Sequence, residues 1–338
     1  MRKLLGHWFR KPETEERALW QAGLFSFDAS VLLNIYAYSN ETRDELMKLI
    51  EANAERVRLP HQFGLEYSRN RAAVIIKQVN NYGKADRDLQ DFQTKHIEPK
   101  REHPHLSDGS VDAIKAVRDD LLGRKKQMES FISTDPFAHR ILNVFEGKLG
   151  PIPTEEELGR LHADAAARYA KNCPPGYADL KDKGVPDAYG DYIGWSQLIE
   201  IAKLEKKGFV LVIDDLKEDW WFIEKERPIG PRPELIEEFF KQTEQQLWLY
   251  TSENFLRAAK KFTNAEIRDE AIEEVTQRLA SQRESAKIAD LKPGLEESKS
   301  LETKNGVPDS EKSAGESALA SNFTSGESAK PTAQNEEE

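Results

Sequence analysis

The sequence predicts an α/β protein built around a doubly wound parallel sheet. Two short apolar runs, Leu24–Phe27 and Phe209–Ile213, have the composition of buried strands, and each is followed directly by aspartate. Segments with apolar residues at helical spacing lie between them along the chain. Because strands that alternate with helices usually form a parallel sheet covered by helices, this order of elements predicts the fold class.

The remaining elements are expected in the following order. The first strand leads into a helix marked by Val31, Leu32 and Ile35, and a second helical stretch covers residues 42–54. Further elements are a brief strand at 57–59 closed by Pro60, a helix that begins near His61, a helix around Trp195 that ends at Gly208, a strand at 247–250 and a helix at 253–259.

Composition divides the chain into successive parts. An N-terminal segment at 1–22 precedes a main domain at 23–262, which contains a charged helical insertion at about 75–172 broken by a polar stretch at 97–108. A C-terminal helix at 263–289 and a tail at 290–338 complete the chain. The tail is rich in Ser, Glu, Lys, Ala, Gly and Asn, and we expect it to be disordered because it offers little apolar surface to offset the entropy of ordering.

The bulk charge and the cysteine content limit the function classes. The chain has 49 Lys and Arg against 60 Asp and Glu, a net charge of -11, so nucleic acid would have to bind through a local patch. The single Cys173 excludes an internal disulfide framework, and no apolar run is long enough to span a bilayer. These features predict a cytoplasmic protein with no membrane partner.

Acidic residues occur where the predicted elements begin or end. Asp28 follows the first strand, Asp214 and Asp215 follow the later one, and Glu66 and Asp191 lie near the starts of helices. Each alone is more simply explained as a helix cap or a turn residue. Together they would crowd one edge of the sheet, where ligands of open α/β sheets bind and where carboxylates repel one another unless a cation joins them. Oxygen donors favour Mg²⁺ or Mn²⁺, and no Cys or His cluster suits zinc.

Several motifs together resemble a bacterial PIN-like domain family, over roughly residues 23–260. The resemblance rests on one acid and six short motifs: Glu66, Phe27–Leu32, Phe145–Gly150, Pro174–Tyr177, Gly190–Trp195, Asp214–Trp221 and Tyr250–Leu256. The most specific part is the Gly-Asp stretch followed by the acidic segment that ends in Asp-Trp-Trp.

This resemblance implies a PIN-like three-layer α/β/α sandwich with a long helical insertion, and a metal-dependent nuclease activity. Carried over residue by residue, it implies that Asp28, Glu66, Asp191 and Asp215 are catalytic and bind Mg²⁺ or Mn²⁺. Asp214 is a further candidate ligand, and both Asp214 and Asp219 compete with Asp215 for the place of the fourth acid. Bound metal would activate water for in-line attack and stabilise the leaving oxygen.

Four residues are candidates for contacting substrate. Ser30 and Asn34 lie one helical turn apart after Asp28 and could orient substrate, although helix capping explains them equally well. Arg71 and Lys217 lie near the acids in sequence and could contact phosphates, with a solvated surface position as the simpler explanation.

The function that the resemblance implies is an endoribonuclease, as a toxin or phage-defence effector. RNA is favoured over DNA by analogy with the family alone. The alternatives are a structure-selective DNA nuclease, which would be expected to carry a basic helical arch, and a non-catalytic module that binds a protein partner through the insertion or the tail.

Overall fold

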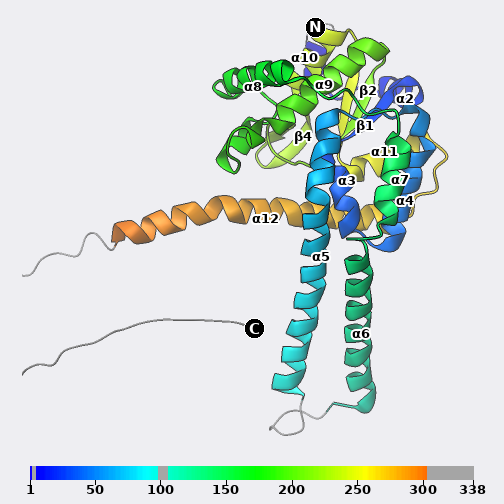
Figure 1. Cartoon of the computed structure of the whole chain (residues 1–338), viewed down its shortest axis with the longest axis vertical. Coiled ribbons are helices and arrows are strands. Elements are labelled where there is room, and N and C mark those ends of the chain that lie inside the picture. Colours follow the sequence, from blue (N-terminus) through cyan, green and yellow to red (C-terminus); the bar gives the residue numbers. More distant parts are fainter. Residues whose placement is uncertain (2–4, 98–105, 303–338) are drawn as a thin grey trace, which may run out of the picture. The chain divides into compact units, whose positions relative to one another are not determined.

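The computed structural model describes residue 1, residues 5–97 and residues 106–302, with side chains through Ser285 (Figure 1). The chain divides into two compact units, Met1–Ser285 and Ala286–Glu338. The sheet, the helical insertion and the acids expected to bind metal all belong to the first unit.

A three-stranded parallel sheet forms the centre of the first unit. Its strands are β1 (Leu24–Phe27), β2 (Phe209–Val212) and β5 (Leu247–Tyr250), in the order β1-β2-β5. Every residue of the three strands is buried, which explains why the strands are apolar apart from the small Ser26 and show no regular polar alternation. Because the strands are parallel, their carboxyl ends meet at one edge of the sheet, with β2 in the middle.

Helices cover both faces of this sheet. In the parallel register Phe209 pairs with Leu24, the residue before Phe25. Because successive side chains of a strand point to opposite faces, the rings of Phe209 and Phe25 lie on opposite faces of the sheet. Trp20 and Phe255 pack on Phe25, with ring centroids 5.2 and 6.0 Å away, whereas Phe239 packs on Phe209 at 6.3 Å. The helices that carry Trp20 and Phe255 therefore cover one face and the helix that carries Phe239 covers the other, which confirms the predicted three-layer α/β/α arrangement.

The helices outside the insertion are α2 (Glu13–Ala22), α3 (Ala29–Asn34), α4 (Asn40–Ala52), α9 (Gly190–Glu205), α10 (Pro233–Thr243), α11 (Ser252–Phe262) and α12 (Asp269–Glu302). Short 3-10 helices are η1 (Gly6–Trp8), η2 (Ile35–Ala37), η3 (Ala54–Arg56), η4 (Tyr177–Lys181) and η5 (Asp187–Tyr189). Trp195 of α9 is fully buried against Trp220 and Phe239, as expected from its helical spacing.

The insertion consists of helices, as the sequence predicts. They are α5 (His61–His96), α6 (Asp108–Ser130), α7 (Pro136–Phe145) and α8 (Glu155–Tyr169), and α5 and α6 run side by side as a hairpin (Figure 1). The more buried residues of α6 are Val111, Ile114, Arg118, Leu121, Lys125 and Met128, which alternate three and four residues apart. This heptad pattern is that of a coiled-coil seam, and the Arg118–Asp86 ion pair of 2.8 Å crosses it. Residues 98–105 of the expected polar break lie outside the described residues.

The structure differs from the sequence expectations at several elements. Residues 57–59 form only isolated bridges, Phe25 with Val57 and Leu59 with Leu149, in place of a strand. An antiparallel hairpin of β3 (Trp221–Glu224) and β4 (Arg227–Pro231) was not expected from the sequence, and neither was α2. Helix α12 continues to Glu302, past the boundary expected near residue 290, and passes through Pro293 and Gly294. The rest of the expected tail lies outside the described residues.

Candidate metal centre

Two of the expected acids lie at the carboxyl edge of the sheet. Asp28 directly follows β1 and caps α3, because its Oδ2 accepts a hydrogen bond of 2.8 Å from the backbone N–H of Ser30. Asp215 follows the middle strand, and its Oδ1 accepts a hydrogen bond of 3.0 Å from the backbone N–H of Lys217. Each carboxylate is thus held by the turn that leaves its strand.

The other two expected acids come from helices that pack against each other. Glu66 lies in the second turn of α5, where Gln62 Nε2 donates to its Oε1 at 2.7 Å, and Asp191 lies in the first turn of α9. A Cβ on Gly190 would lie only 2.3 Å from Glu66 Oε1, so any larger residue before Asp191 would displace the Glu66 carboxylate from its present position. The Trp220 indole donates to Asp191 Oδ2 at 3.1 Å and fixes that carboxylate.

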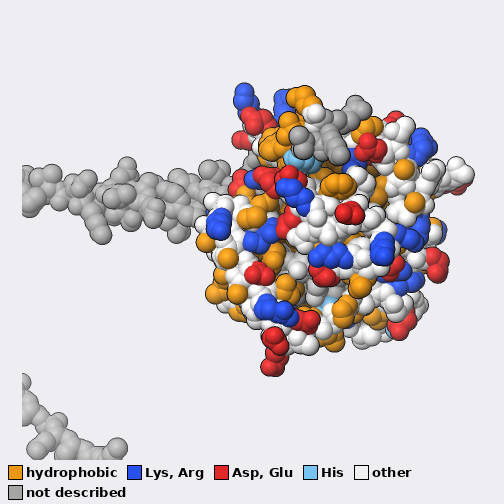
Figure 2. Space-filling view, turned by 90° about the horizontal axis from the view of Figure 1, so that it is seen from above, with side chains coloured by type: hydrophobic (Ala, Val, Ile, Leu, Met, Phe, Trp, Pro, Cys, Tyr) orange, Lys and Arg blue, Asp and Glu red, His pale blue; other side chains and the backbone are white. Residues whose placement is uncertain are grey.

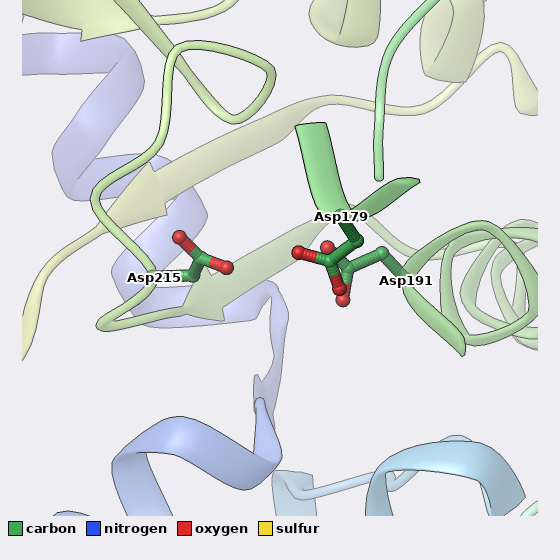
Figure 3. Close-up of side chains that lie close together, drawn as sticks. All are labelled: Asp179, Asp191 and Asp215. Atoms are coloured by element: carbon green, nitrogen blue, oxygen red, sulfur yellow. The ribbon is translucent and has the colours of Figure 1, made fainter. Parts of the chain in front are cut away.

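A fifth acid, Asp179, joins the group and was not predicted from the sequence. Its side chain comes from η4, and Asp179, Asp191 and Asp215 each offer an oxygen within 4.8 Å of the others (Figure 3). The turn before η4 begins at Gly176, which has a φ of 91° and whose Cβ would lie 2.8 Å from the Cβ of Asp191. The Pro-Pro-Gly turn was therefore the only local signal, and it does not identify Asp179.

Burial and neighbouring negative charge raise the pKa of Asp28 and Asp191, whereas, despite burial, hydrogen bonds from Lys183 and Lys217 hold the pKa of Asp179 below its usual value. Burial raises the pKa of Asp191 well above its usual range, and the charges of Asp215, Asp179, Asp28 and Glu66 raise it further. Burial and the charge of Glu66 likewise raise the pKa of Asp28 to about 7. The structure therefore brings the four expected catalytic acids and Asp179 into one electrostatic cluster, which we call the acid cluster.

Asp214 lies apart from the acid cluster, although it was expected to be a metal ligand. Its carboxylate accepts hydrogen bonds from Asn34 Nδ2 at 2.9 Å and from the N–H and hydroxyl of Ser252, both at 2.8 Å. Its own N–H donates to Ser30 Oγ at 3.0 Å. These contacts give Asp214 the environment of a structural carboxylate that ties α3 and α11 to the end of β2.

Asp219, the other alternative for the fourth acid, supports the loop that carries Asp179. Its Oδ2 accepts hydrogen bonds from the N–H groups of Gly176 and Ala178, at 2.9 and 3.1 Å. Its Oδ1 is buried and has no hydrogen-bond partner within the described part of the chain. Asp219 therefore positions η4, and with it Asp179.

The four substrate candidates are engaged in contacts within the protein. Ser30 and Asn34 belong to the surroundings of Asp214. Arg71 forms an ion pair of 2.6 Å with Asp135 at the base of the α5–α6 hairpin. Ser30 also donates its N–H to Asp28, and Lys217 contacts Asp179 and lies 3.2 Å from Asp215, so these two candidates reach the acid cluster.

The acid cluster has the chemistry of a site for a hard divalent cation. Every donor in it is a carboxylate oxygen, which suits Mg²⁺, Mn²⁺ or Ca²⁺ and not a metal that prefers sulfur or imidazole. Asp191 and Asp215 keep partial exposure, so an ion could enter from solvent. A cation would also relieve the repulsion that raises the carboxyl pKa values.

Comparison with known proteins identifies the family. The model of the PIN-like domain family matches residues 24–235, which is more than half of the chain, and this span includes all five members of the acid cluster. No curated protein and no solved structure shows significant similarity to the chain. Among the described residues, no helix is long and apolar enough to cross a membrane. PIN domains are generally nucleases that bind nucleic acid and use divalent metal ions. The chain therefore belongs to the PIN-like domain family, a family within the nuclease superfamily.

Proposed function

We propose that this protein is a metal-dependent endoribonuclease whose catalytic centre is the acid cluster. The observation that carries the proposal is the convergence of Asp179, Asp191 and Asp215, with donor oxygens within 4.8 Å of one another at the carboxyl edge of a PIN-like sheet. Carboxylates placed this close are costly to a fold unless a cation uses them. Asp28 and Glu66 complete the set that would hold Mg²⁺ or Mn²⁺.

The protein's own contribution to the reaction is to position these carboxylates. The Ser30 N–H holds Asp28, Gln62 holds Glu66, and the Trp220 indole holds Asp191. When bound, a divalent ion supplies an activated water for attack on the phosphate and charge to stabilise the leaving oxygen. Fixed neighbours keep the carboxylates from rearranging as charge develops, which is how a preorganised site lowers a barrier.

The α5–α6 hairpin argues against a DNA nuclease of the arch type. An arch that threads a DNA strand would be expected to carry an excess of basic residues, whereas here Arg118 pairs with Asp86 and Arg124 with Asp120. On the face seen in Figure 2, the described acidic and basic side chains are interspersed without a field of one sign. The preference for RNA, and a role as a toxin or phage-defence effector, rest on analogy with PIN relatives.

A cleavage assay tests the proposal. Purified protein is incubated with labelled single-stranded RNA and with DNA of the same sequence, in Mg²⁺, in Mn²⁺ and in EDTA. We expect metal-dependent cleavage of RNA that is lost in Asp191→Asn and retained in the matched control Asp187→Asn, an exposed aspartate four residues earlier. Cleavage that survives EDTA or Asp191→Asn would remove the acid cluster from the reaction, and cleavage of DNA alone would overturn the choice of substrate.

A further inference from the structure

The ammonium group of Lys217 lies among the acids that would hold a metal ion. Its Nζ contacts Oδ1 of Asp179 and lies 3.2 Å from Oδ2 of Asp215. These are two of the three acids that each offer an oxygen within 4.8 Å of the others. The Lys217 side chain thus bridges the candidate metal centre from the Asp215 side.

A metal ion at this centre would compete with Lys217 for the same oxygens. An ion bound by Asp179 and Asp215 would lie about 2 Å from each donor oxygen, and an ammonium hydrogen-bonded to those oxygens would then be within a few ångströms of a divalent charge. Both oxygens of Asp179 already contact an ammonium group, because its Oδ2 accepts from Lys183. A divalent ion on either oxygen would therefore lie beside a lysine ammonium, and the two positive charges would repel each other.

The Lys217 ammonium can move away from the acid oxygens while its backbone stays in place. Its backbone is fixed, because its N–H donates to Asp215 Oδ1 at 3.0 Å, while four methylene groups let the ammonium swing away from that anchor. Its side chain is 35% exposed, so a path to solvent exists. An ammonium displaced by metal would remain beside the centre, where a phosphate would bind.

We propose that Lys217 is a built-in counter-ion that occupies the candidate metal centre in the metal-free protein and withdraws when a divalent ion binds. This inference rests on the proposed function, because it takes the acid cluster as the metal centre. It gives Lys217 two successive partners, the acids without metal and the substrate phosphate with metal. Divalent metal and the Lys217 contacts to Asp179 and Asp215 then exclude each other.

Calorimetric titration with Mn²⁺ tests this exclusion without any activity measurement. The proteins are wild type, Lys217→Met and the matched control Lys183→Met, which removes a lysine that pairs with Asp179 but makes no ion pair with Asp215. Loss of a competing ammonium should tighten Mn²⁺ binding by about tenfold or more in Lys217→Met, and the change in the local field should tighten it by only about threefold or less in Lys183→Met.

The outcomes separate this inference from the proposed function. Unchanged or weaker Mn²⁺ binding in Lys217→Met, or an equal gain in both variants, overturns the displacement of Lys217 and leaves the metal centre in place. If neither wild type nor Lys217→Met binds Mn²⁺, the metal centre itself is wrong and both proposals fall.

A second measurement uses only the wild-type protein, in case the variant does not fold. Competitive acetylation read by mass spectrometry should show that saturating Mn²⁺ raises the labelling rate of Lys217 relative to that of exposed Lys241. An unchanged ratio means that the ammonium keeps its place when metal binds, which contradicts the inference.

Discussion

Asp214 and Asp215 are neighbours after the same strand, yet their surroundings are opposite in kind. Asp214 accepts three hydrogen bonds, from Asn34 and Ser252, and all its donors are neutral. Asp215 lies among other carboxylates and is approached by Lys217. Burial of an acid therefore does not by itself mark it as functional. What distinguishes the two sites is whether the protein itself supplies enough donors to satisfy the carboxylate.

Replacing each acid by its amide tests whether Asp214 has a structural role and Asp215 a functional one. Asp215→Asn should lower metal-dependent cleavage by about a hundredfold or more, because even the neighbours of metal ligands are commonly worth 10- to 100-fold. Asp214→Asn should lower the free energy of unfolding by about 1 to 3 kcal/mol. The new amide NH₂ is itself a donor and would face the hydrogen-bond donors of Asn34 and Ser252. Cleavage rates and urea unfolding of both variants, with and without Mn²⁺, measure this. Equal loss of activity in two equally stable variants would contradict the assignment of a structural role to Asp214 and a functional role to Asp215.

Asp28→Asn tests whether repulsion between the carboxylates of the acid cluster destabilises the metal-free protein. Removing one charge while keeping the shape should leave the metal-free melting temperature equal to or above that of wild type. Wild type should gain about 2.7 kcal/mol of stability at a metal concentration 100 times Kd, and the variant much less. Thermal melts across a Mn²⁺ titration provide the measurement. A destabilised variant that keeps the full metal-dependent gain would show that Asp28 is only a helix cap.

The raised pKa of Asp28 predicts an unusual pH dependence of stability. Its pKa rises from 3.8 to about 7 in the fold, so between these values the native state holds more protons than the unfolded state. The metal-free protein should therefore lose stability as pH rises from about 4 to about 7, which is the reverse of an acid stabilised by a salt bridge. Melting temperatures across this range, compared with those of Asp28→Asn, measure the contribution. Wild-type stability that increases in parallel with that of the variant would contradict the shift.

The smallest expected effect concerns the tryptophan that holds Asp191. Trp220→Phe removes the indole donor to Asp191 and should weaken Mn²⁺ binding by about tenfold. The matched control is Trp221→Phe, because the Trp221 indole donates to the backbone carbonyl of Asp215 and to no carboxylate. Titration calorimetry well below the melting temperatures compares the two. Equal affinities would mean that the Trp220 hydrogen bond does not orient a ligand.

The sheet could be predicted because its strands are buried on both faces. The runs at 24–27, 209–212 and 247–250 are apolar except for the small Ser26, a pattern typical of strands in a fully covered parallel sheet. The β3–β4 hairpin could not be predicted in the same way. Strand β4 contains Pro228 and Pro231, which count against a strand unless it lies at an edge.

The candidate site was predictable only in part. Asp28, Glu66, Asp191 and Asp215 were expected from strand ends and from the family resemblance. Asp179 was not, because η4 has no periodic pattern, and its position depends on distant contacts of Asp219 with the preceding loop. The roles of Asp214 and Asp215 were also undecided, since a strand buried on both faces has no polar alternation from which to assign the side of each acid.

Helix α5 links the acid cluster to the far end of the insertion. It is one uninterrupted helix of 36 residues, with a length of roughly 54 Å at 1.5 Å per residue, and Glu66 lies in its second turn. The Arg71–Asp135 ion pair and the hydrogen bond between the hydroxyls of Tyr67 and Tyr36 brace the helix just beyond that point. The same helix that forms one side of the insertion therefore carries Glu66 of the acid cluster, and it is anchored to the rest of the unit within two turns of that residue.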